Sequence, residues 1–70
     1  MYYDEAIQLV NEGYRMTRDV WDMAYISKDG YGVINYVRTT RIEDQQITTK
    51  NTYFSSLSDR GANDWKEYEE

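Results

Sequence analysis

The first thirteen residues place apolar side chains at the spacing of an α-helix. The positions that fall on one face are Tyr3, Ala6, Ile7 and Val10. Spacings of three and four residues bring side chains to the same side of a helix, so this face is predicted to pack on a sheet. Asp4 is predicted as the N-cap, Glu5 follows in the first turn, and Gly13 is predicted to end the helix.

After residue 13 the pattern changes to the alternation of apolar and polar residues that is typical of β-strands. A short strand is predicted at 14–18. The clearest hairpin pairs 23–27 with 33–37, because Asp29-Gly30 is a strong turn signal and the returning segment is rich in β-branched and aromatic residues.

The centre of the chain is more polar, and its predicted elements are less regular. Residues 38–46 are predicted as a loop. Residues 46–54 are predicted as a weaker hairpin that turns at Lys50-Asn51.

The last part of the chain completes the predicted fold. Ser56 or Ser58 is predicted to cap one short helical turn, and 63–70 alternates as a closing strand would. The sum is a single α+β domain spanning 1–70. It has one N-terminal helix packed on a small antiparallel sheet of about five strands, with a short helical turn before the last strand.

Size and composition limit both stability and chemistry. The chain has 70 residues, no cysteine and no histidine, which closes off disulfides and the usual zinc sites. A core this small rarely supplies more than about 3–5 kcal/mol, so we expect self-association into a homo-oligomer, a dimer or tetramer. Without histidine or cysteine the usual nucleophile–base pairs are impossible, so the chain is predicted not to be an enzyme and to need no cofactor or metal.

The distribution of charge bears on partners and location. The net charge is −5, with −3 in each of 1–13 and 51–70 and +1 in 14–50. A protein that binds long nucleic acids normally has a basic face, so no such partner is expected. No apolar run reaches the length of a membrane helix and no basic-then-apolar leader is present, so we expect a cytoplasmic protein that does not enter the membrane.

Flat aromatic side chains and charged hydrogen-bonding groups are the parts of a small nucleotide site. The candidates are Tyr3, Arg18, Trp21, Tyr25, Asp59, Asn63 and Asp64. Aromatic faces stack on nucleobases, carboxylates accept hydrogen bonds from ribose hydroxyls, and arginine matches phosphate oxygens. Trp65 is predicted to anchor the closing strand in the core, whereas Trp21 fits the core and a ligand site equally well.

The segment Arg38-Thr39-Thr40-Arg41 has two interpretations. Two arginines around two threonines suffice to hold a phosphate. Charged runs usually face water, and the sequence favours this solvated loop.

Two blocks at the ends of the chain have a recognisable arrangement. In 4–22 the matching positions are Glu5, Ala6, Ile7, Gly13, Arg15, Arg18 and Trp21. In 59–70 they are Asp59, Ala62, Asp64 and Trp65. Both blocks resemble the phage Thoeris anti-defense proteins of the second type. Arg60-Gly61 departs from that family's apolar pair, and Tyr53-Phe54 stands where the family usually has a tryptophan.

The resemblance implies a phage protein for immune evasion that captures a signal without cleaving it. Proteins of that family form homo-oligomers whose pockets, between protomers, hold cyclic ADP-ribose isomers or cyclic oligonucleotides, the signals of Thoeris and CBASS defence. By resemblance, Trp21 stacks on a base and Asp59 or Asp64 hydrogen-bonds ribose or a base edge. Arg18 faces phosphate or braces the pocket wall.

Two other classes of function stay open at the level of sequence. One alternative is a small protein-binding inhibitor of a host defence enzyme, and its basis is the net charge of −5 with acids at both ends. A metal held by Asp59 and Asp64 would instead make the chain a hydrolase, although the sequence has no Asp-x-Asp spacing and no calcium-loop pattern.

Overall fold

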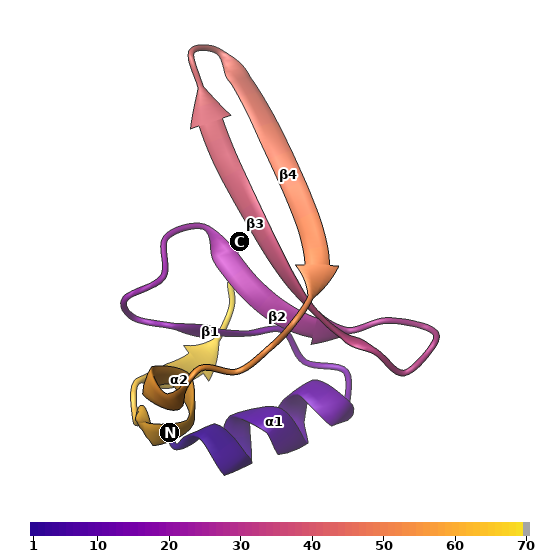
Figure 1. Cartoon of the computed structure of the whole chain (residues 1–70), viewed down its shortest axis with the longest axis vertical. Coiled ribbons are helices and arrows are strands. Elements are labelled where there is room, and N and C mark those ends of the chain that lie inside the picture. The colour runs from indigo at the N-terminus through magenta and orange to yellow at the C-terminus, as the bar shows by residue number, and fades with distance from the viewer. Residues whose placement is uncertain (70) are drawn as a thin grey trace.

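The helices and strands form one antiparallel sheet with both helices on the same side (Figure 1). The computed structural model describes residues 1–69. Its elements are α1 (Tyr3–Asn11), β1 (Met16–Arg18), β2 (Ala24–Lys28), β3 (Ile34–Ile42), β4 (Gln45–Thr52), α2 (Leu57–Gly61) and β5 (Trp65–Glu67). Among the described residues five strands pair antiparallel in the order β4-β3-β2-β1-β5. The predicted α+β class is confirmed.

The start of α1 differs from the prediction. The N-cap is Tyr2, whose side chain makes no capping hydrogen bond, so the assignment of Asp4 as N-cap is wrong. Asp4 and Glu5 both lie in the first turn. Carboxylates there interact favourably with the partial positive charge of the helix N-terminus, which compensates for the missing cap.

The end of α1 is a Schellman motif, as the glycine predicts. Gly13 has φ +104°, a conformation that glycine adopts without steric cost. The N–H of Gly13 donates to the C=O of Val10, and the N–H of Tyr14 donates to the C=O of Leu9, both at 3.0 Å. These two bonds end the helix and direct the chain into β1.

The core lies between α1 and the sheet. Its buried residues are Ala6, Val10, Met16, Ile26 and Trp65. The helical stripe that the sequence predicts is therefore the buried face of α1. Trp65 is 2% exposed, and its indole N–H donates to the C=O of Asp59 at 3.0 Å, so its predicted role as core anchor is confirmed. No helix within residues 1–69 is long and apolar enough to span a membrane.

The hairpin of β3 and β4 corrects the prediction for the centre of the chain. The predicted loop at 38–46 and the turn at Lys50-Asn51 are both wrong. The two strands pair without interruption from Asn35–Thr52 to Ile42–Gln45, and the chain turns at Glu43 and Asp44. All eight residues of β4 are exposed, so no buried face imposes an apolar alternation on the sequence.

Residues 38–50 project from the body of the molecule (Figure 1), and we call them the arm. Every arm residue except Thr39 is exposed. The arm therefore contributes little to the core, which is built by α1 and the strands β1, β2 and β5.

The short helix α2 begins with a capping box. Of the two serines predicted as caps, Ser56 is the one used. Its Oγ accepts the N–H of Asp59 at 3.1 Å, and Oδ2 of Asp59 accepts the N–H of Ser56 at 3.4 Å. The closing strand β5 covers three residues of the predicted 63–70, and residue 70 lies outside the described part of the chain. Together the cap and β5 fix the position of Asp59.

Candidate functional site

A nearly buried ion cluster joins β1 to α2 and to the residue before β5. Arg18 lies in β1, Asp59 in α2, and Asp64 directly before β5. Nε of Arg18 donates to Oδ1 of Asp64 at 2.9 Å, and Nη1 donates to Oδ1 of Asp59 at 3.0 Å. The side chains of Arg18 and Asp59 are each 11% exposed, and that of Asp64 is 23% exposed. Hydrogen bonds to Asp64 and to Asp59 raise the pKa of Arg18. The hydrogen bond from Arg18 in turn lowers the pKa of Asp64.

Both carboxylate oxygens of Asp59 are already used within the chain. Oδ1 accepts from Arg18, and Oδ2 accepts the phenol O–H of Tyr53 at 2.9 Å as well as the capping N–H of Ser56. Burial, together with this bond to Asp59, raises the pKa of Tyr53 far above its usual range. Asp59 therefore holds the walls of the site in place and has little capacity left to bind a ligand.

Trp21 lies at the centre of an aromatic cluster. Its ring contacts Trp65, Tyr36 and Tyr53 edge-on, with centroid distances of 5.1, 5.2 and 6.3 Å. The ring of Tyr3 also packs on Trp65, with the two ring centroids 5.9 Å apart. Edge contacts of this kind contribute about 0.5–1.5 kcal/mol each beyond area burial, so the cluster fixes the orientation of Trp21.

A first hollow, which we call the aromatic groove, opens between β3, β4 and α2. It has a volume of about 440 Å³. Its lining residues are Trp21, Tyr36, Asn51, Thr52, Tyr53, Phe54, Ser56 and Asp59. Phe54 is 85% exposed, which leaves an aromatic face available at the rim. Aromatic rings with a few neutral hydrogen-bonding groups are typical of sites for flat organic ligands.

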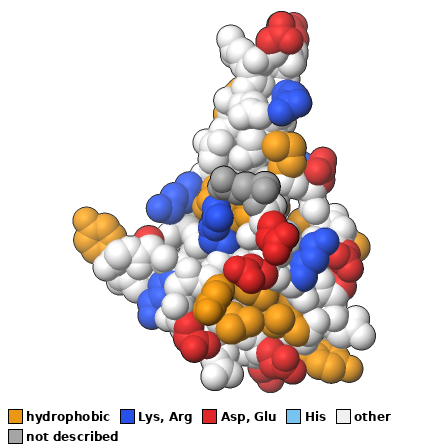
Figure 2. Space-filling model, turned by 180° about the vertical axis from the view of Figure 1, so that it is seen from behind, with side chains coloured by type: hydrophobic (Ala, Val, Ile, Leu, Met, Phe, Trp, Pro, Cys, Tyr) orange, Lys and Arg blue, Asp and Glu red, His pale blue; other side chains and the backbone are white. Residues whose placement is uncertain are grey.

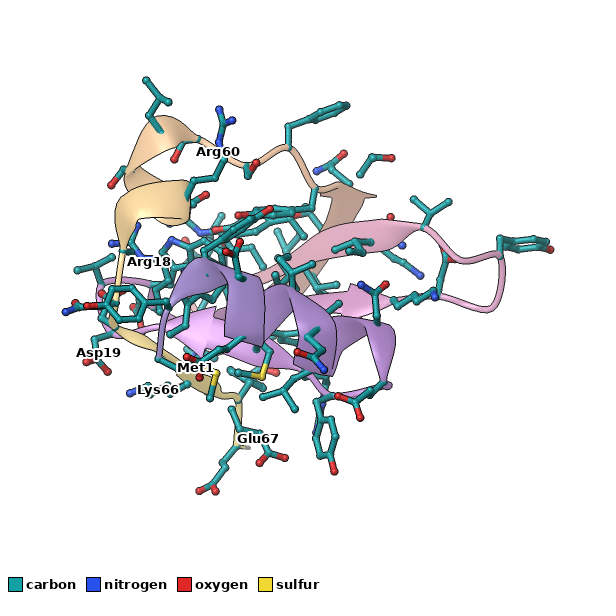
Figure 3. The ribbon with its side chains drawn as sticks, turned by 90° about the horizontal axis from the view of Figure 1, so that it is seen from below. Met1, Arg18, Asp19, Arg60, Lys66 and Glu67 are labelled. Atoms are coloured by element: carbon teal, nitrogen blue, oxygen red, sulfur yellow. The ribbon has the colours of Figure 1, made fainter. Side chains whose placement is uncertain are left out.

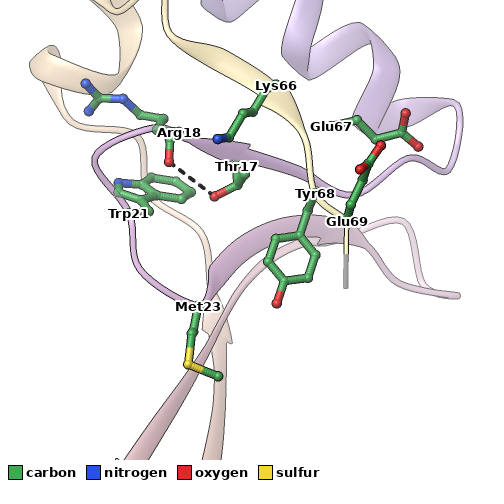
Figure 4. Close-up of a pocket in the computed structure, with 8 residues that line it drawn as sticks. All are labelled: Thr17, Arg18, Trp21, Met23, Lys66, Glu67, Tyr68 and Glu69. Atoms are coloured by element: carbon green, nitrogen blue, oxygen red, sulfur yellow. Dashed lines mark hydrogen bonds between the residues drawn. The ribbon is translucent and has the colours of Figure 1, made fainter.

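A second hollow, the edge groove, lies beside β1 and β5 (Figure 4). Its volume is about 480 Å³, and it is lined by Thr17, Arg18, Trp21, Met23, Lys66, Glu67, Tyr68 and Glu69. The guanidinium of Arg18 points away from this hollow. Figure 4 shows it directed away from the side chains of Thr17 and Tyr68. Lys66 is paired with Asp19 at 2.7 Å on the surface. The charges here are mixed, and the groove has fewer aromatic faces than the first.

The structure brings together five of the seven residues predicted for the site. Arg18, Asp59 and Asp64 form the ion cluster, and Tyr3 and Trp21 both pack against Trp65. Of these five, Trp21 and Asp59 line the aromatic groove. Arg18 lies between the carboxylates of Asp64 and Asp59 and donates a hydrogen bond to each.

The other two predicted residues lie elsewhere. Tyr25 lies on the opposite face of the sheet, where its ring is 4.6 Å from that of Tyr68, and the guanidinium of Arg15 lies over both rings. Asn63 is exposed, and its C=O accepts a hydrogen bond from the ammonium group of Met1 at 3.0 Å. Neither residue lines either groove.

Several residues of the aromatic groove were missing from the sequence-based site. They are Tyr36, Asn51, Thr52, Tyr53, Phe54 and Ser56. The adjacent aromatics Tyr53-Phe54 were the available signal. The others became neighbours of Trp21 only through the pairing of β3 with β4, which the polar sequence of this segment conceals.

Two segments with open roles lie outside the grooves. Arg60 is exposed on α2 (Figure 3), and the space around Gly61, the last residue of α2, is open, so neither changes the lining of a groove. Arg38 and Arg41 lie in β3 on the arm, where both are exposed. Within residues 1–69 no group of three or more acidic side chains is arranged to hold a metal ion.

Comparison with known proteins adds no identity. No protein-family model, curated protein or solved structure matches the chain.

Proposed function

We propose that this chain binds a cyclic nucleotide-type immune signal in the aromatic groove and sequesters it without cleaving it. The observation that carries the proposal is that the exposed ring of Phe54 and the ring of Trp21 line the same hollow, whose other lining groups are mainly neutral hydrogen-bonding side chains. A nucleobase stacks on such rings with about 1–3 kcal/mol per base.

The polar contacts to the ligand come from Asn51, Thr52 and Ser56. Their amide and hydroxyl groups can donate to ribose and phosphate oxygens. The lining residues include no lysine or arginine, and Arg18 is already held by two carboxylates. Base stacking and neutral hydrogen bonds therefore dominate recognition, with Asp59 and Arg18 bracing the wall behind them.

Binding without turnover agrees with the chemical groups that the chain offers. It contains no histidine and no cysteine. The nearest carboxylate to the groove, Asp59, already accepts hydrogen bonds on both oxygens, so it is poorly placed to remove a proton from a nucleophile.

The test is a capture-and-release experiment. The protein is incubated separately with cyclic ADP-ribose isomers and with cyclic di- and trinucleotides, freed of unbound ligand and denatured by heat. Recovery of an intact signal supports the proposal, recovery of a cleaved product identifies an enzyme, and failure to retain any of these compounds rules the proposal out.

Phe54→Ala tests the location of the site. Because Phe54 is 85% exposed, its truncation leaves the core intact while removing a stacking face, and we expect affinity to fall about tenfold or more. Leu57→Ala is the matched control, since Leu57 is 81% exposed and does not line the groove. Titration calorimetry measures both. Equal affinities for the two variants would place the ligand elsewhere.

A further inference from the structure

The outer edge of β4 is long and unprotected. All eight residues of this strand are exposed, and β4 is an edge strand of the sheet. Its one charged residue is Lys50, and the chain contains no proline. Natural edge strands are usually short, charged, bulged or covered, because an open edge pairs readily with another strand.

The ladder between β3 and β4 shows which backbone groups face outward. The N–H of Tyr53 donates to the C=O of Ile34 at 2.9 Å, beside the paired residues Asn35 and Thr52. Bonded and non-bonded pairs alternate in an antiparallel ladder. The N–H and C=O groups that point away from β3 are therefore those of Gln46, Thr48, Lys50 and Thr52.

The opposite edge of the sheet, formed by β5, is short and charged. β5 has three residues, two of which are the charged Lys66 and Glu67. The N–H of Trp65 donates to the C=O of Met1 at 3.2 Å, and the ammonium group of Met1 donates to the C=O of Trp65 at 3.0 Å. Met1 therefore covers this short, charged edge at Trp65, whereas β4 presents a longer edge whose eight residues are all exposed.

The arm also lacks support of its own. Its two strands are exposed on both faces, with Ile42 55% and Ile47 45% exposed. A two-stranded ribbon without a third strand or a covering helix is marginally stable in water. A third strand beside β4 would supply this support.

We propose that β4 pairs antiparallel with β4 of a second copy of this chain, about a two-fold axis near Thr48, so that the two sheets become one. A two-fold axis perpendicular to the sheet brings outward-facing residues opposite one another. Thr48 then faces its own counterpart and Gln46 faces Lys50, so no like charges are opposed.

Charge favours a second copy as the occupant. The arm carries the bases Arg38, Arg41 and Lys50 against the acids Glu43 and Asp44, whereas the chain as a whole has a net charge of −5. The excess negative charge therefore lies outside the arm, and Figure 2 shows mostly uncharged side chains along it. Pairing through the arms joins two copies while their acidic bodies stay apart.

Thr48→Pro tests this interface, with Thr48→Ala as the matched control. Proline removes an N–H that points away from β3, so the hairpin is retained, but the ladder to a second copy loses a bond on each side of the axis. Sedimentation velocity across a concentration series should show wild type and Thr48→Ala forming the same dimer or higher assembly. Thr48→Pro should associate at least about tenfold more weakly.

If Thr48→Pro disturbs folding, the interface can still be tested with the variant Thr48→Asp and with amide hydrogen exchange of the wild type. Thr48→Asp opposes two carboxylates at the axis and should also weaken association. Amide exchange at Thr48 and Lys50 should slow as wild-type concentration rises. A monomeric wild type, or undiminished association in Thr48→Asp with exchange that does not depend on concentration, would overturn the proposal.

Discussion

At the scale of single residues, Asp59 has the largest number of structural roles. Its carboxylate holds Arg18, the phenol of Tyr53 and the N-cap of α2, and its C=O accepts the indole N–H of Trp65. A carboxylate in such a place is tolerated because each of its oxygens is paired. Changing it should therefore affect folding before it affects any ligand.

We expect Asp59→Asn to lower the free energy of unfolding by about 3 kcal/mol, because it leaves Arg18 with half of its compensating charge in a site that is 11% exposed. Asp64→Asn should cost clearly less, since the carboxylate of Asp64 is 23% exposed and lacks the second side-chain donor, Tyr53, that Asp59 has. Urea unfolding followed by tryptophan fluorescence measures both. Equal losses would show that Asp59 is not the centre of the cluster.

The sequence identifies the residues of this cluster but not their partners. Arg18, Asp59 and Asp64 are visible as charged groups near tryptophans in the sequence, which predicts that they contact a ligand. Their mutual distances depend on the pairing of β1 with β5, which sets Arg18 opposite Trp65. A single sequence does not show that pairing, so it cannot separate groups that bind a ligand from groups that bind each other.

At the scale of elements, the turn of the arm contains a conformational conflict. The hairpin loop has two residues, and Glu43, the first, has φ +56°. A side chain in this region costs roughly 1–2 kcal/mol, and two-residue turns with a positive φ at the first position prefer glycine there.

Replacing Glu43 with glycine should stabilise the protein by about 0.5 kcal/mol, because the relief of this conflict is partly offset by the greater freedom of glycine in the unfolded chain. Asp44→Gly is the control, since Asp44 does not have a positive φ. Thermal unfolding of both variants decides the matter. A gain for Asp44→Gly and none for Glu43→Gly would contradict the turn geometry.

The same turn explains why the sequence predicts some elements and not others. α1 and β2 each bury one face, so their apolar residues follow the period of a helix or a strand. β4 buries neither face, and glutamate rather than glycine begins the turn before it. Neither of the usual signals of a hairpin is present in this segment.

At the scale of the whole molecule, charge and binding should act against each other. The chain has a net charge of −5, and the aromatic groove is lined by no lysine or arginine. A cyclic nucleotide is also negatively charged, so the two repel at long range. Salt screens such repulsion over a Debye length of about 10 Å at 0.1 M ionic strength.

We therefore expect affinity for the retained signal to rise by about twofold to threefold between low and physiological ionic strength. A site built around a cationic clamp would show the reverse. Calorimetric titrations of one signal at two salt concentrations distinguish these cases. A steep loss of affinity with salt would mean that a basic side chain, and not the aromatic groove, dominates recognition.

The contact between Trp21 and Trp65 also gives the protein a built-in optical reporter. These are the two tryptophans of the sequence, and their rings are 5.1 Å apart at 80°. At this separation the indoles exchange excitation energy, so the ultraviolet emission of the chain is one shared signal. A ligand that enters the aromatic groove next to Trp21 should therefore change the fluorescence of Trp65 as well. Ligand binding and unfolding of the core can both be followed by this fluorescence without any label.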